Sequence, residues 1–321
     1  MCALWDIAAC DGPWRGGRDP LWESGGVQDA EHTEMGAAIA RMQAMLAAGG
    51  IEDPAADVEL ILAHVLGVSR GRVQALTVMG ESLTGAQWDA ARELAEERAR
   101  RTPLQHLTGR APFRTIELSV GPGVFVPRPE TETVAQFAID ALQLVPSAAP
   151  IAVDLCTGSG AIALALAHEV PTARVWAVEK SREAHAWAER NVTEWGDGRV
   201  TLLRGDVARL GTLPEIGALQ GTVDVLISNP PYVPADMVPR DPEVRDHDPE
   251  LALYGGADGL DVVRIISRAA RELVRPGGLL VLEHAELQGA AIRELLAADG
   301  WRAAATHPDL TGRDRATTAL R

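Results

Sequence analysis

The run Asn229-Pro230-Pro231-Tyr232 combines residue types that can hold a planar nitrogen group. The side-chain oxygen of Asn229 and the backbone carbonyl of Pro230 can each accept one hydrogen bond. The two prolines stiffen the backbone and preorganise that carbonyl, and the Tyr232 ring can lie against a flat group. When both protons of an NH2 group are held by hydrogen-bond acceptors, electron density returns to the nitrogen and its lone pair becomes more available for methylation. The run therefore predicts methyl transfer to an amide or amine nitrogen, with Asn229, Pro230 and Tyr232 as catalytic residues.

A glycine-rich turn, Asp154-Leu155-Cys156-Thr157-Gly158-Ser159-Gly160, follows a short apolar run. Its glycines allow a tight turn and a close approach of the backbone to a ligand. Glu179 ends the next apolar run, where a carboxylate can accept from both hydroxyls of a ribose. Asp206 follows the third run and can accept from an exocyclic amine, while Val207 offers an apolar edge to an adenine ring. These positions predict a site for a nucleoside-containing cofactor.

The turn by itself leaves the identity of that cofactor open. Gly158, Gly160 and Ala163 also fit the dinucleotide fingerprint, and Glu179 stands roughly 20 residues further on, as that motif expects. Two features favour S-adenosylmethionine over NAD. Asp154 precedes the glycines, where it can orient the loop and lie near the amino end of the donor. The Asn-Pro-Pro-Tyr run, in addition, is not needed for hydride transfer.

Five short apolar runs, most of them separated by helical stretches, must position these motifs. Short apolar runs are typical of buried parallel strands. Their alternation with helices predicts a doubly wound, Rossmann-like α/β sheet, in which the carboxyl ends of the strands meet at a cofactor crevice. Both motifs follow such runs and are therefore expected at that edge. The runs are Ile151–Leu155, Val175–Val178, Val200–Leu203, Val223–Ile227 and Leu279–Leu282.

The chain divides into four parts by pattern. Residues 1–34 are rich in Gly, Trp, Asp and Pro without a period, which predicts a disordered tail. Residues 35–102 show apolar positions at helical spacing and predict an N-terminal helical domain. Residues 103–128 have a sequence pattern typical of extended strands, with a turn at Gly121-Pro122-Gly123, which predicts a β-hairpin linker. Residues 129–321 form the predicted methyltransferase domain.

Composition limits the classes of function. The 321 residues, 46% of them hydrophobic, suffice for one sizeable core and a smaller domain. A formal net charge of -15 repels phosphate backbones, so stable nucleic-acid binding is not expected. Three cysteines give neither a disulfide framework nor metal-ligand spacing, which predicts a reducing cytoplasm and no metal. No apolar run approaches the roughly 20 residues of a membrane span, so no membrane association is expected.

A few further residues are weighed beside the two motifs. The segment from Val233 to Asp258 is long, polar and proline-rich, and it is predicted to be a substrate lid. His284 ends the fifth apolar run and is expected to be structural or at the surface. Arg128 and Glu130 are expected to pair with each other or to line the site. Cys156 has no predicted thiol chemistry.

Several motifs occur in an order that resembles the HemK/PrmC family of release-factor glutamine methyltransferases. The resemblance covers residues 35 to 321 and is specific through the order and combination of its motifs. The Asn-Pro-Pro-Tyr motif alone is shared with adenine-N6 DNA methyltransferases. The motifs are Val126–Glu132, Asp154–Gly160, Asn229–Val233, Tyr254–Leu260 and Gly277–His284.

The resemblance implies a helical N-terminal domain, a hairpin linker and a seven-stranded class I methyltransferase domain. It implies methylation at N5 of the glutamine in the Gly-Gly-Gln motif of class 1 peptide chain release factors. S-adenosyl-L-methionine is the implied donor and the release factor the implied partner. The implied donor contacts are Cys156, Thr157, Gly158, Ser159, Gly160, Glu179, Val207 and Asn229, and the implied substrate contacts are Asn229, Pro230, Pro231 and Tyr232.

This chain departs from the family pattern at three positions. Cys156 replaces a commoner glycine, Glu179 a commoner aspartate and Ala285 a commoner glycine. None of these changes removes a proposed role, although the longer Glu179 side chain can shift a bound ribose.

Alternative functions stay open at this stage. The substrate nitrogen could belong to another protein glutamine or be adenine N6 in nucleic acid, although a DNA enzyme would want a target-recognition domain and a basic face. An NAD-dependent oxidoreductase and a non-catalytic donor-binding module are the other classes. The intact Asn229 and Tyr232 argue against the last of these. The run could also be no more than a proline-stiffened turn, and the sequence assigns no base to remove the product proton.

Overall fold

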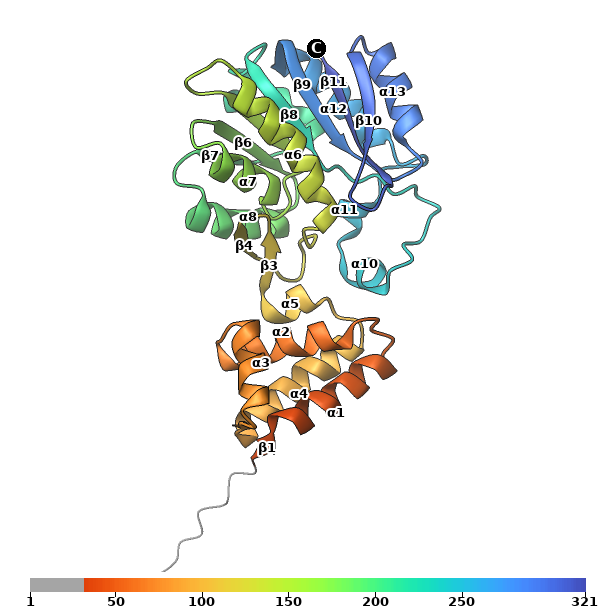
Figure 1. The fold of residues 1–321 in the computed structure, drawn as a ribbon. Helices are drawn as coiled ribbons and strands as arrows, with labels where there is room; N and C mark the ends of the chain where they lie inside the picture. The colour runs from red at the N-terminus through yellow and green to blue at the C-terminus, as the bar shows by residue number, and fades with distance from the viewer. Residues whose placement is uncertain (1–31) are drawn as a thin grey trace, which may run out of the picture.

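A computed structural model describes residues 32–321. A small helical domain lies at one end of the molecule and a larger α/β domain at the other, with a β-hairpin and a short helix between them (Figure 1). Most of the predicted disordered tail lies outside the described residues. Within the described residues, Thr33–Glu34 of that predicted segment form strand β1, which pairs antiparallel with β2, Ser82–Leu83.

The N-terminal domain is a bundle built around one apolar core. Local signals start two of its helices. Asp53 accepts from the backbone of Ala56 with Pro54 at the first turn, and Thr84 forms a capping box with Gln87. The side chains of Met42, Leu46, Ile61 and Leu62 are fully buried between the helices. The helices are α1 Met35–Ala48, α2 Pro54–Leu66, α3 Arg70–Val78 and α4 Gly85–Ala99, and the short helix α5 Leu104–Thr108 follows them at the junction with the hairpin.

The linker contains a β-hairpin, but its turn is not the predicted one. Strands β3, Arg110–Phe113, and β4, Ile116–Ser119, pair antiparallel across Arg114-Thr115. Gly121-Pro122-Gly123 is a turn, as predicted, but it follows the hairpin and does not join its two strands. Arg114 adopts a left-handed φ of 53°, and its guanidinium bonds the Glu169 carboxylate and Gln136. Tertiary contacts therefore hold a turn that the sequence does not signal.

The α/β domain is built on a seven-stranded sheet in the order β10-β11-β9-β8-β5-β6-β7, which confirms the predicted fold class. The five strands from β9 to β7 are parallel, and β11 and β10 are antiparallel to their neighbours. All five predicted runs lie in strands, whereas no pattern predicted β10 and β11. The strands are β5 Ile151–Leu155, β6 Arg174–Glu179, β7 Val200–Arg204, β8 Val223–Ser228, β9 Val274–Glu283, β10 Arg302–Pro308 and β11 Asp314–Leu320.

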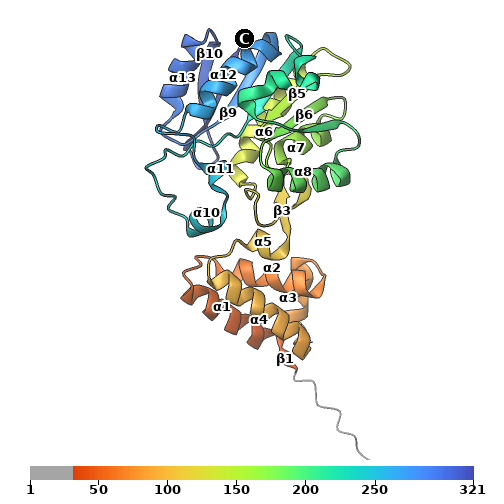
Figure 2. The ribbon, with the colours of Figure 1, turned by 180° about the vertical axis from the view of Figure 1, so that it is seen from behind.

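Helices cover both faces of this sheet, and each face has its own apolar core. Figure 1 shows α6 in front of the sheet, and Figure 2 shows the opposite face with α12 in front. One face carries α6 Pro129–Leu144, α7 Ala161–Glu169 and α8 Arg182–Trp195. The other carries the 3-10 helix η1 Val207–Thr212, α9 Pro214–Gly217, α12 Asp261–Leu273 and α13 Gly289–Ala298.

The long connection after β8 contains two short helices, α10 Pro242–His247 and α11 Glu250–Leu253. It leaves the sheet edge and runs toward the N-terminal domain, where α10 lies (Figures 1 and 2). From residue 32 to the C-terminus, no helix has both the length and the apolar character to cross a membrane.

Candidate active site

The two predicted motifs leave the sheet side by side. Strands β5 and β8 are parallel neighbours, and Leu155 stands opposite Ser228 in their register. The Ser228 hydroxyl donates a 2.6 Å hydrogen bond to the Leu155 carbonyl and ties the two strand ends together. Cys156 directly follows β5, and Asn229 directly follows β8. Because β5 also pairs with β6 on its other side, the motifs stand at the point where a doubly wound sheet binds its ligand.

A cavity of about 1080 Å³ opens at this edge and is lined by residues of both motifs. Its walls also include residues of the connection after β8. Pro230 and Gly160 are not among the lining residues. Pro230 is buried, and Gly160, with a φ of 86°, caps the start of α7. The predicted residues that line the cavity are Cys156, Thr157, Gly158, Ser159, Glu179, Val207, Asn229, Pro231 and Tyr232.

Glu179 holds the glycine-rich turn through its carboxylate. One oxygen accepts from the Gly158 amide at 2.9 Å and the other from the Ser181 amide at 2.6 Å. Burial raises the pKa of Glu179, and the two amides oppose that shift. Each carboxylate oxygen has a second lone pair, so Glu179 can hold the turn and still accept from the hydroxyls of a ribose.

Asp154 orients the turn from below and does not line the cavity. Its Oδ2 accepts from the Thr157 hydroxyl at 2.5 Å and from the Ala163 amide at 3.1 Å. Burial raises the pKa of Asp154 to about 7, and these hydrogen bonds oppose the rise. Oδ1 is buried with no partner within residues 32–321. The carboxyl therefore organises the loop backbone, as predicted, and is not itself on the cavity wall.

Cys156 stands in the turn at a φ of 63°, in the left-handed region that glycine adopts without cost. That conformation costs a residue with a side chain roughly 1–2 kcal/mol. Burial raises the pKa of the Cys156 thiol, so it stays protonated. This geometry gives a physical meaning to the glycine that is commoner at this position in the family pattern.

Asp206 is the third acidic residue, after Asp154 and Glu179, that the sequence predicts for the cofactor site. It lines the cavity beside Val207 and forms an ion pair of 3.0 Å with Lys180. Its other oxygen accepts from the Ala208 amide at 2.9 Å, and this bond chiefly lowers the pKa of Asp206. A ribose acceptor at Glu179, an amine acceptor at Asp206 and an apolar wall at Val207 fit the nucleoside of S-adenosylmethionine.

The Asn-Pro-Pro-Tyr corner is held by segments that come later in the chain. A β-carbon on Gly255 would lie 2.5 Å from the Pro231 carbonyl oxygen, and one on Gly259 would lie 2.2 Å from that of Tyr232. Only glycine allows this close backbone packing. Gln288 donates a 2.9 Å hydrogen bond to the Tyr232 carbonyl. Sequence reasoning missed Gln288, which no local motif distinguishes.

Three more polar residues, Thr131, Glu283 and Arg315, line the cavity together with Asn229 and were also missed. Its Nδ2 donates to the Thr131 hydroxyl over 3.4 Å. Glu283, at the end of β9, is buried, and burial raises its pKa to about 7. The side chains of Thr131, Arg315 and Asn229 oppose this effect of burial and lower the pKa of Glu283. Glu283 could have been found, because it ends a predicted strand at the cavity edge. Arg315 could not, because it lies on a strand that was not predicted.

The remaining candidate residues have clear positions. His284 is buried and its Nε2 lies 2.8 Å from the Thr317 hydroxyl of β11, which is a structural contact. Burial lowers the pKa of His284, so the ring is neutral. Arg128 and Glu130 both line the cavity. Arg128 bonds Asp248 at 2.7 Å and not Glu130.

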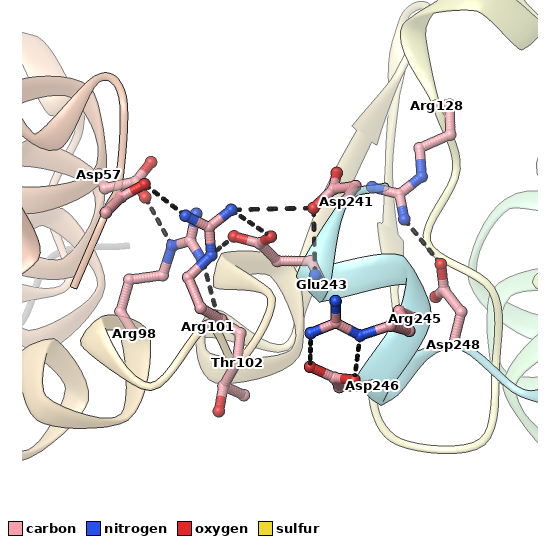
Figure 3. A network of polar contacts seen from close by, with 11 residues as sticks. Asp57, Arg98, Arg101, Thr102, Arg128, Asp241, Glu243, Arg245, Asp246 and Asp248 are labelled. Carbon is pink, nitrogen blue, oxygen red and sulfur yellow. Dashed lines mark hydrogen bonds and ion pairs between the residues drawn. The ribbon is translucent and has the colours of Figure 1, made fainter. Parts of the chain in front are cut away.

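Ion pairs tie the connection after β8 to the N-terminal domain (Figure 3). The buried Glu243 of α10 accepts from Arg98 and from Arg101, each at 2.6 Å. Arg98 also bonds Asp57 of α2 at 2.6 Å. Burial raises the pKa of Glu243, but the surrounding hydrogen bonds outweigh it and lower the pKa to about 2. The wall formed by Met237, Val238 and Val244 is thus anchored to a separate domain.

Comparison with known proteins gives two matching family models and close relatives. The PrmC N-terminal domain matches residues 37–109, and a methyltransferase domain matches residues 152–238. A release factor glutamine methyltransferase of Streptomyces coelicolor is 48% identical over 88% of this chain and 96% of that protein. The protein of the same name from Bifidobacterium longum is 47% identical over 86% of this chain and 96% of that protein. The one from Mycolicibacterium smegmatis is 44% identical over 90% of this chain and 98% of that protein.

Proposed function

Since this chain belongs to the release factor glutamine methyltransferase family, we propose that it methylates the glutamine of the Gly-Gly-Gln motif in class 1 peptide chain release factors. The methyl group passes from S-adenosyl-L-methionine to the N5 amide nitrogen. The products are S-adenosylhomocysteine, an N-methylated glutamine side chain in a factor of translation termination, and the proton that the amide nitrogen gives up. The family is one of methyltransferases, so it gives no support to the oxidoreductase alternative.

One observation carries the proposal: Asn229 and the glycine-rich turn line the same cavity from adjacent strand ends. A donor on the turn and an amide on the corner would therefore stand next to each other. Such proximity replaces a bimolecular encounter by a positioned one, which lowers the barrier to methyl transfer. No metal or nucleophilic side chain is required.

The residues of the corner suit an amide nitrogen. S-adenosylmethionine, when bound, supplies an electrophilic methyl group on a sulfonium. The Asn229 oxygen accepts one proton of the substrate NH2, and the Pro230 carbonyl is the proposed acceptor for the other. Burial raises the pKa of Tyr232, which keeps its ring neutral beside the flat amide. The Val207 and Glu179 side of the cavity holds the donor nucleoside.

The direct test is a methylation assay with the purified protein and a donor labelled in its methyl group. The substrates are a class 1 release factor, the same factor with its Gly-Gly-Gln glutamine changed to alanine, and a DNA duplex. We expect label in the first alone, located on the glutamine by peptide mass spectrometry. Label in DNA, or in the alanine variant at the wild-type level, would overturn the proposal.

A further inference from the structure

Exposed apolar side chains gather at the opening of the cavity. Ten large hydrophobic side chains are exposed within residues 32–321. Four of the ten line this one cavity: Met237, Val238, Leu251 and Leu287, which are 57%, 66%, 49% and 93% exposed. Because each of them lines the cavity and is also open to solvent, the four lie at its mouth, and we call them the apolar rim. Single exposed apolar residues are common on proteins, but a group around one opening marks an interaction site.

Met237 and Val238 are held at the mouth by a stiff and anchored segment. They lie between β8 and α10, and Pro234 and Pro239 on either side of them also line the cavity. Each proline fixes its own φ angle and reduces the freedom of the backbone. Helix α10, which follows directly, is tied to the N-terminal domain through Glu243. The two side chains are therefore presented with little conformational entropy left to lose when a partner binds.

The other two rim residues connect this segment to the catalytic corner. Leu251 lies in α11, whose last residue accepts a 2.8 Å hydrogen bond from the Val233 amide, next to the corner. Leu287 lies between β9 and α13 and directly precedes Gln288, which donates to the Tyr232 carbonyl at 2.9 Å. The apolar rim is thus continuous with the Asn-Pro-Pro-Tyr run that is expected to hold the substrate amide.

The position of the rim and the chemistry of the target motif identify what covers it. A glutamine that belongs to a protein has to pass the mouth of the cavity to reach Asn229, so the polypeptide around it comes against the rim. The two residues before that glutamine are glycines, which have no side chain. Apolar cover for four exposed side chains has to come from residues of the folded release factor outside the Gly-Gly-Gln motif.

We propose that the apolar rim is the docking surface for apolar side chains of the release factor that lie outside its Gly-Gly-Gln motif. The inference rests on the proposed function, because it takes the release factor as the partner. Recognition would then read the folded factor and not the tripeptide alone. Binding would remove apolar surface from water, and the measurable sign of that burial is a negative change in heat capacity.

Steady-state kinetics with the release factor give the first test. The double variant Met237→Ser/Val238→Ser and the single variant Leu287→Ser replace rim residues by a small polar one. We expect the KM for the factor to rise about 10- to 100-fold in the double variant and about 3- to 10-fold in Leu287→Ser, as for apolar anchors of an interface. The kcat at saturating factor and the KM for the donor should stay at the wild-type values.

The chain offers matched controls away from the cavity. Val78 and Met79 are an adjacent pair of the same two residue types, 88% and 62% exposed, and neither lines the cavity. Leu144, at the end of α6, is exposed and does not line it either. Val78→Ser/Met79→Ser and Leu144→Ser should therefore keep the wild-type KM for the factor.

Calorimetry measures the docking without methyl transfer. The ligand is the release factor with its Gly-Gly-Gln glutamine changed to alanine, titrated into the protein in the presence of S-adenosylhomocysteine at several temperatures. We expect the wild type to bind this factor with a negative change in heat capacity. The Met237→Ser/Val238→Ser variant should bind it about 10-fold or more weakly, with a smaller change in heat capacity.

The two proposals fail in different ways. If the wild type binds the factor but transfers no methyl group to it, the proposed function is wrong and the docking surface stands. If the wild type methylates the factor and the rim variants keep its KM and its affinity, the docking surface is wrong. Equal losses in the rim variants and in the matched controls would also overturn it. A wild type that neither binds nor methylates the factor would overturn both proposals.

Discussion

The two sides of the cavity are built in different ways. On the donor side, Glu179 bonds the amides of Gly158 and Ser181, 21 and 2 residues away along the chain. On the side formed by the connection after β8, Glu243 bonds Arg98, 145 residues away and in another domain. The donor side is thus made of local strand-to-helix turns. The opposite wall depends on how two domains pack against each other.

Because they are built differently, the two sides of the cavity suit different ligands. Turns at the ends of buried strands hold fixed geometry, which suits a small cofactor of constant shape. A wall anchored by ion pairs to a neighbouring domain changes whenever the domains shift, which suits a large protein substrate. Asn229 stands where the two sides meet. Substitutions on either side should therefore affect different kinetic constants.

The largest effect is expected at the meeting point. Asn229→Ala removes the proposed acceptor at the reacting nitrogen while leaving the fold intact. Loss of one preorganised acceptor costs about 10²–10³ in kcat. Single-turnover transfer of labelled methyl at saturating donor measures it, with urea unfolding as the control for the fold. An undiminished rate would remove Asn229 from the mechanism.

On the donor side, Glu179→Ala should weaken S-adenosylmethionine binding by about 1–3 kcal/mol, the usual loss for a charged hydrogen-bond partner. The KM for the release factor should not rise in parallel at saturating donor. Glu183→Ala is the matched control, because Glu183 is an exposed carboxylate on the neighbouring helix α8. Calorimetry that gave the same donor affinity for wild type and Glu179→Ala would refute the role of Glu179.

Between the two sides, Glu283 should make the stability of the donor-free protein depend on pH. Its pKa is about 7 in the fold and near 4.5 when unfolded, so the folded state holds the proton more tightly. Stability from this group is complete below pH 4.5 and is lost as the pH rises through 7. At about 1.4 kcal/mol per pKa unit, the full loss is about 3 kcal/mol.

Glu283→Gln removes that dependence. The free energy of unfolding of the variant minus that of the wild type should therefore increase between pH 5 and pH 8. Asp154, whose pKa burial also raises to about 7, is present in both proteins and cancels in the difference. Urea unfolding at the two pH values measures it. A difference that does not change with pH would show that the Glu283 carboxyl is not perturbed.

The smallest effect is expected for the anchored wall. Glu243→Ala leaves Arg98 and Arg101 without their shared partner, which should lower stability by about 1–2 kcal/mol, less than for a fully buried pair. We expect a severalfold higher KM for the release factor and an unchanged donor affinity. Arg245→Ala breaks the exposed pair with Asp246 on the same helix and should change neither. A weaker donor affinity in Glu243→Ala would contradict the division between the two sides.

The low pKa of Glu243 sets the pH range of its contribution. Because the pKa is about 2 in the fold and near 4.5 when unfolded, the ion pairs stabilise the protein above pH 4.5 and are lost as the pH falls toward 2. The stability difference between wild type and Glu243→Ala should therefore shrink in acid. The same unfolding experiment at pH 3 and pH 7 checks this.

Much of the fold could be predicted because its signals are local. The five parallel strands are short apolar runs, and Asp53-Pro54 and Thr84 mark helix starts by their side-chain chemistry. β10 and β11 escaped prediction because most of their residues are not buried and their sequences, rich in Ala and Thr, have no clear period. The hairpin turn at Arg114 could not be predicted from local sequence, because its left-handed backbone is held by side chains that are distant along the chain.

The sequence by itself determined which chemistry the site can do, because residue type and local backbone decide hydrogen-bonding capacity. The glycine-rich turn, Glu179 and the Asn-Pro-Pro-Tyr run each follow a strand that pattern alone predicts. The tertiary structure alone decided how those groups are held. Thr131 reaches Asn229 across 98 residues, and Glu243 reaches Arg98 across 145. Such contacts form only when packing brings distant segments together, and no local property of the chain encodes them.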